Sequence, residues 1–248
     1  MWLKLLAPAV VIGLAACGGE QANESGAAPS PSTNSSSSVA HTDSQLTQYL
    51  SDATICGVLS TDKIKSEFGV TAAIETRPSS YGNRFTCSYS WDRPDAEERE
   101  KKMIGSIMAA AQGGAKLSMR EKTPSGEIAI TLGTSTRKAA HFVPRKLTDE
   151  QLQAQIDAAQ KATDEKLTNE QKAAAGDMAK SFTEKLLKKN NQNEEIKGVG
   201  DAAFWSKMGF GSLNVHFQGV EIYIAPMIAD TEEEDVENAK RVFSMLNN

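Results

Sequence analysis

The stretch RFTCSYSW, residues 84–91, alternates without interruption between apolar and polar side chains. The apolar positions are Phe85, Cys87, Tyr89 and Trp91. Successive side chains of a β-strand point to opposite faces, so this period of two predicts a strand with one buried face. The chain must therefore build a sheet and cover one side of it.

Two further stretches show the same alternation. They are GEIAITLG at 126–133 and GSLNVHFQGVEIYIAP at 211–226. The second is interrupted at Gln218-Gly219, the length of a two-residue hairpin turn in which glycine supplies positive φ. These patterns predict antiparallel pairing.

Helical signals flank the predicted strands. Residues 59–69 offer Ser60 and Thr61 as caps and Gly69 as a stop, and residues 94–112 start at Pro94 before an apolar-periodic run. In the tail, Thr231 and Glu234 form a capping box ahead of Val236, Ala239, Phe243 and Leu246 on one face. We expect this last helix to pack on the sheet.

A short repeat marks the middle of the chain. LTDEQ at 147–151 recurs as LTNEQ at 167–171, and each copy offers a Thr cap with Gln at the third helical position. The following apolar stripes are Leu152, Ile156 and Ala159, then Ala175, Met178, Phe182 and Leu186. The sequence thus predicts one α+β domain at 46–248, an antiparallel sheet with packed helices and a helical hairpin inserted at about 147–196.

The N-terminus reads as a targeting segment. Lys4 precedes an apolar run from Leu5 to Ala16 that is shorter than the roughly 18 residues a spanning helix needs. This pattern predicts a cleaved signal peptide at 1–16.

The end of that run, Leu14-Ala15-Ala16-Cys17, resembles the lipobox of bacterial lipoproteins. The resemblance implies that the Cys17 thiol takes a diacylglycerol, that the chain is cut before it, and that the new amine is acylated. Covalent lipid on Cys17 is then the only cofactor expected, and the membrane is a partner through this anchor. Gly18 stands where inner-membrane retention would require Asp, which implies the outer membrane if the source is Gram-negative. The alternative is an ordinary signal peptide with an incidental cysteine.

Residues 17–45 are small and polar with almost no large apolar side chain. Such a segment cannot bury enough surface to offset its ordering entropy, so it predicts a flexible tether. About 28 residues of this composition span about 30 Å. The tether would hold the folded part near a bilayer.

Cys56 and Cys87 are the cysteines that remain. An even pair in a chain sent to an oxidising compartment predicts a disulfide. A redox pair would need a C-x-x-C spacing, and two lone cysteines with dispersed histidines make a poor metal site.

A second resemblance rests on Cys56 with Leu59, on residues 87–91, and on GVGDAA at 198–203 followed by Phe204-Trp205. These blocks are similar to a pattern in small bacterial lipoproteins of uncharacterised function. The resemblance implies a compact α+β domain and supplies no catalytic residues.

Catalytic motifs are weak in this chain. It lacks G-x-S-x-G, and the S-x-x-K matches at Ser60 and Ser135 have none of the partner motifs of that enzyme class. His216 reads as a solvent-facing strand histidine. A net charge of −5 in a secreted chain argues against nucleic acid as a partner.

These observations favour a membrane-anchored cell-envelope lipoprotein that acts as a non-catalytic binding or interaction module, with another envelope protein as partner. The expected contact surface on the hairpin is Leu152, Ile156, Phe182 and Leu186. In the alternative interpretation, the apolar faces of both hairpin helices pack on the sheet of the domain. An envelope hydrolase with a site not visible in the sequence, or a small-ligand binder with a pocket of several hundred Å³, also stays open.

Overall fold

The computed structural model describes residues 45–111, 123–166 and 168–247, which all belong to one unit of the chain, Ala40–Asn248. The predicted signal peptide, the lipidation site Cys17 and the tether up to residue 44 lie outside the described residues.

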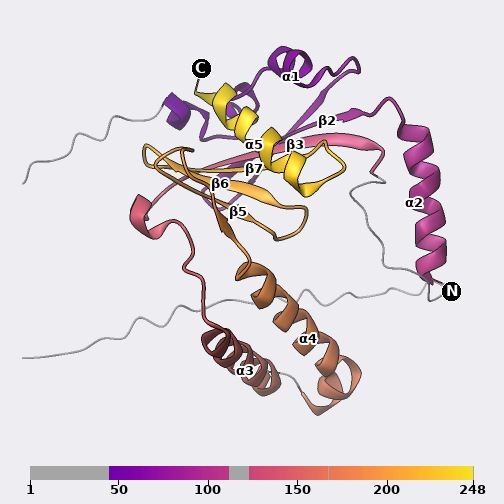
Figure 1. The fold of residues 1–248 in the computed structure, drawn as a ribbon, viewed down its shortest axis with the longest axis vertical. Helices are drawn as coiled ribbons and strands as arrows, with labels where there is room; N and C mark the ends of the chain where they lie inside the picture. The colour runs from indigo at the N-terminus through magenta and orange to yellow at the C-terminus, as the bar shows by residue number, and fades with distance from the viewer. Residues whose placement is uncertain (1–44, 112–122, 167, 248) are drawn as a thin grey trace, which may run out of the picture. The chain divides into compact units, whose positions relative to one another are not determined.

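Within the described residues the strands form one seven-stranded antiparallel sheet in the order β1-β2-β3-β7-β6-β5-β4 (Figure 1). The predicted α+β class is confirmed. The strands are β1 Glu75–Tyr81, β2 Arg84–Asp92, β3 Ser125–Thr134, β4 Glu194–Glu195, β5 Ala202–Ser206, β6 Ser212–Phe217 and β7 Val220–Met227.

The alternation in β2 separates the two faces of the sheet as predicted. Cys87, Tyr89 and Trp91 are buried, and Cys87 pairs with Ile130 of β3, which pairs with Ile224 of β7. A continuous apolar layer therefore crosses the centre of the sheet on this face. The residues between them lie on the opposite face, which is mostly polar.

Two helices and two short 3₁₀ turns contribute to the core. The elements are η1 Gln45–Tyr49, η2 Ile55–Gly57, α1 Thr61–Phe68 and α5 Glu232–Leu246. In α1, Ser60 caps the first turn and Gly69 ends the helix at φ 63°, as predicted. Ala239 and Phe243 of α5 join the core, which confirms that the last helix packs on the sheet (Figure 1).

The connection from β6 to β7 is the predicted two-residue hairpin turn. Both of its residues have positive φ, 49° at Gln218 and 79° at Gly219, as in a type I′ turn. Only the glycine was expected to do so. The Gln218 backbone N–H donates to Asp201 Oδ2 at 2.8 Å, so a neighbouring loop holds the turn in place.

The disulfide between Cys56 and Cys87 is present, with the two Cα atoms 5.1 Å apart. It ties η2 to the apolar face of β2. The Tyr89 hydroxyl donates to the Cys56 carbonyl at 3.1 Å, so this attachment has a second point of contact.

The inserted helical hairpin consists of α3 Asp149–Lys166 and α4 Asn169–Asn190, which lie side by side between β3 and β4 in the chain (Figure 1). Thr148 and Gln151 form the predicted reciprocal capping box at the start of α3. Asn191 bonds both the N–H and the carbonyl of Leu147, which joins the two ends of the hairpin.

The remaining helix, α2 Ala96–Ala111, follows β2 and agrees with the predicted start after Pro94. The glycines expected to end it lie outside the described residues. Among the helices of the described ranges, none has the length and apolar character needed to cross a bilayer.

Candidate functional site

A cavity of about 510 Å³ opens where β2 leaves the sheet. Its wall comes from the end of α1 and the residues after it (68–72), from the β2–α2 connection (91–95), and from Asn238 and Arg241 of α5. This volume is typical of sites for small molecules. It also meets the size expected of a small-ligand binder.

Trp91, Phe68 and Val70 supply large apolar side chains beside the polar part of the lining. Trp91 is 9% exposed and its indole lies over Gly126, where an added Cβ would come within 2.7 Å of the ring carbon Cε2. Any larger residue at position 126 would clash with the indole in its present position. Phe68 and Val70 lie beside it, half-buried against the core.

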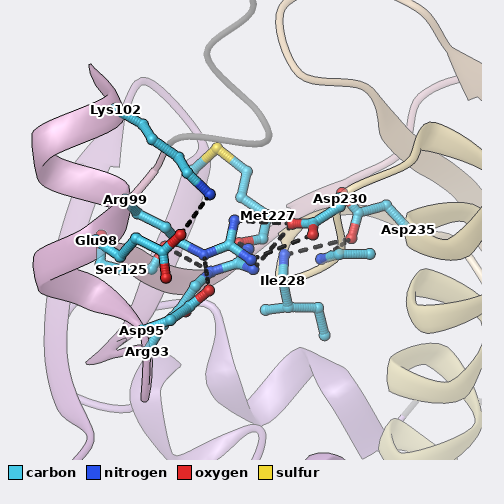
Figure 2. Close-up of polar contacts among 11 residues, drawn as sticks. Arg93, Asp95, Glu98, Arg99, Lys102, Ser125, Met227, Ile228, Asp230 and Asp235 are labelled. Atoms are coloured by element: carbon cyan, nitrogen blue, oxygen red, sulfur yellow. Dashed lines mark hydrogen bonds and ion pairs between the residues drawn. The ribbon is translucent and has the colours of Figure 1, made fainter. Parts of the chain in front are cut away.

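Two arginines form one side of the cavity and share one carboxylate (Figure 2). Arg99 donates to both Asp230 oxygens, at 2.8 and 3.2 Å, and to Asp95 Oδ2 at 2.8 Å. Arg93 reaches Asp230 at 3.4 Å and also donates to the carbonyls of Met227 and Ser125. This arrangement, the Arg93–Arg99–Asp230 clasp, joins the first turn of α2 to the loop between β7 and α5.

Hydrogen bonds shift the pKa values of Arg99, Asp95 and Asp230 toward their charged forms. The bonds from Arg99 hold the pKa of Asp230 below its ordinary value and do the same for Asp95. Burial and the neighbouring Arg99 charge lower the pKa of Arg93, but an arginine stays charged at neutral pH. The two arginines of the clasp are balanced by two carboxylates, those of Asp230 and Asp95.

The hairpin surface predicted from the sequence is only partly accessible. Phe182 is 58% exposed, whereas Leu152 and Leu186 are half-buried. Ile156 is 1% exposed, so it cannot contribute to a contact surface. Met178, one turn before Phe182 on α4, is 76% exposed and was not included in the predicted surface.

The polar face of the sheet holds a buried carboxylate. Glu221 of β7 is 6% exposed and accepts from Ser135 Oγ and Arg137 Nε at 3.0 Å and from the Tyr223 hydroxyl at 2.6 Å. Burial raises the pKa of Glu221, but these hydrogen bonds outweigh it and hold the pKa below its ordinary value. The arrangement fastens the segment after β3 onto the sheet.

His216 corrects a sequence interpretation. It is 8% exposed rather than solvent-facing, because the segment after β3 crosses this face and places Phe142 5.7 Å from the imidazole. Its Nδ1 lies 3.3 Å from Asp201 Oδ2 and its Nε2 lies 3.1 Å from the Arg137 carbonyl. Both ring nitrogens thus take part in structural contacts.

The part of the chain that the structure describes holds no group of three or more His, Cys, Asp or Glu side chains placed to bind a metal ion. Comparison with protein-family models, with curated proteins and with solved structures finds no match to this chain.

Proposed function

We propose that this protein is a membrane-anchored cell-envelope lipoprotein that acts as a non-catalytic interaction module and binds another envelope protein through α4. The observation that carries the proposal is the exposed pair Met178 and Phe182. Residues four apart lie on one face of a helix, so the two side chains form a single apolar patch.

The position of this patch in the fold supports a role in binding. The main core cluster of the described residues contains no side chain of α3 or α4, since buried Ile156 of α3 lies outside it and the two helices pack chiefly against each other. The hairpin therefore does not complete the core, and its exposed apolar side chains need another reason to be there. Aromatic side chains and methionine are enriched at protein interfaces.

The N-terminal sequence supports an envelope partner. A lipid on Cys17 and a tether of about 30 Å would confine the folded part to the neighbourhood of one bilayer. In a Gram-negative source this would be the outer membrane. Confinement raises the effective concentration of partners held at the same surface, so a small apolar patch suffices.

In-cell cross-linking with affinity capture tests the patch. Full-length protein carrying Met178→Ser and Phe182→Ser should lose a partner that the parent captures. The matched control is Ile107→Ser with Met108→Ser, because these side chains of α2 are also exposed, at 47% and 59%. Capture that is unchanged by the α4 pair, or reduced equally by both pairs, would contradict the proposal.

The anchor has its own test. Cys17→Ser should leave an uncleaved precursor without lipid, detected by a mass shift and by loss of metabolic labelling with palmitate. Continued acylation of this variant would refute Cys17 as the lipidated residue while leaving the α4 patch untouched.

A further inference from the structure

We propose that the cavity beside Trp91 binds an uncharged saccharide unit. This goes beyond the proposed function, because the cavity and the α4 patch share no residue. The argument rests on the hydrogen-bonding groups among the lining residues, on the balance of charge in the lining and on its apolar side chains.

Several polar groups of the lining are available to a ligand. In the described parts of the chain, neither the Trp91 indole N–H nor the Asn238 amide has a hydrogen-bond partner. Asn193 Oδ1 is the one fully covered side-chain polar atom without a partner in those same parts. The indole N–H must therefore be accessible, and Trp91 lines the cavity.

These free groups include both donors and acceptors. The indole N–H only donates, and the Asn238 amide both donates and accepts. A ligand that satisfies both groups must itself carry donors and acceptors. Hydroxyl groups meet this requirement, because each donates one hydrogen bond and accepts others.

The lining carries no excess of either charge. Its ionisable side chains are Glu67, Asp92, Asp95, Arg93, Arg99 and Arg241. Three are acidic and three are basic, and both clasp arginines already hold carboxylates. Arg241 stands 4.0 Å from Glu67. An anionic ligand would find no unneutralised pair of cations here, which favours a neutral ligand.

The apolar side chains complete the match. Trp91, Phe68 and Val70 belong to the lining together with its polar groups. A sugar ring has C–H groups on its faces and hydroxyl groups around its edge, so it pairs apolar contact with peripheral hydrogen bonds. A cavity of about 510 Å³ has the size of a small-ligand site.

Calorimetric titration of the detergent-solubilised full-length protein tests this proposal. The probes are N-acetylglucosamine, N,N′-diacetylchitobiose and maltose, with sodium acetate and sodium phosphate as anionic comparisons. We expect saturable binding of at least one saccharide. Asn238→Ala should weaken it about tenfold, the effect of losing one or two hydrogen bonds. Trp91→Phe, which keeps an apolar ring but removes the N–H, should also weaken it.

Glu233→Ala is the control, since this exposed residue of α5 does not line the cavity. Saccharide binding that survives Asn238→Ala unchanged would place the ligand elsewhere and overturn the proposal. Binding of acetate or phosphate alone would replace it with an anion site. Absence of saturable binding by all three saccharides at tens of millimolar would refute it, and none of these results affects the α4 patch.

Discussion

The Cys56–Cys87 disulfide permits a quantitative prediction about stability. Its cysteines are 31 residues apart, and Cys87 is fully buried while Cys56 is half-buried. Cys56→Ala removes the cross-link while leaving the Cys87 sulfur in the core. Cys87→Ala would add a buried cavity, so Cys56→Ala is the cleaner perturbation.

The magnitude follows from the length of the closed loop. In the chain-entropy model a loop of this size restrains the unfolded chain by about 3 to 4 kcal/mol. Domains of about 200 residues shift in Tm by about 2 to 4 °C per kcal/mol. Cys56→Ala should therefore lower Tm by about 6 to 16 °C, a large share of typical domain stability.

Urea unfolding followed by circular dichroism measures both the free energy and its slope, the m-value. The m-value should rise in Cys56→Ala, because the unlinked unfolded chain exposes more surface. Reductant should destabilise the parent and leave Cys56→Ala unchanged. Two results would refute an effect on the unfolded state: a decrease in the free energy of unfolding below about 1 kcal/mol, or a decrease of the expected size with an unaltered m-value.

Three further predictions concern packing and ionisation. Gly126→Ala should lower the free energy of unfolding by about 1 to 3 kcal/mol, because the added Cβ would come within 2.7 Å of the Trp91 ring. Thermal unfolding measures this change, and an unchanged Tm would show that the indole can move away from the added methyl group. Since the pKa of Glu221 is depressed in the fold, the ionised carboxylate stabilises the folded state, and this contribution should be lost progressively as pH falls below about 4.3. The difference in free energy of unfolding between the parent and Glu221→Gln should therefore become smaller in acid. Burial raises the pKa of Tyr89 to about 12, so the free energy of unfolding should fall more steeply with pH between about pH 10 and 12. Tyr89→Phe should remove this additional fall.

The elements that the sequence predicted well have one buried face. In β2, β3 and α5 a single side contacts the core, so the apolar period appears directly in the residue order. Caps are equally local, and Ser60, Thr148 and Thr231 each accept the expected backbone N–H. Such elements depend on neighbours a few residues away in the chain.

The sequence did not predict β1 and β5, for opposite reasons. Every residue of β1 is exposed at the edge of the sheet, so no alternation marks it. In β5, Phe204 meets Phe142 on one face while Trp205 joins the core on the other, so both faces are apolar and the period vanishes. A strand that is exposed on both faces and a strand that is buried on both faces therefore both lack the alternation of apolar and polar residues.

The sequence by itself determined the α+β class, the paired cysteines and the hairpin insertion, because each depends on local order or on composition; the membrane address stays a prediction. Only the tertiary structure decided which side chains share a site. Trp91 of β2 and Asn238 of α5 line one cavity, and His216 is buried because a distant segment crosses its strand. Proximity between residues far apart in the chain follows from how strands and helices pack, and residue periodicity does not record it.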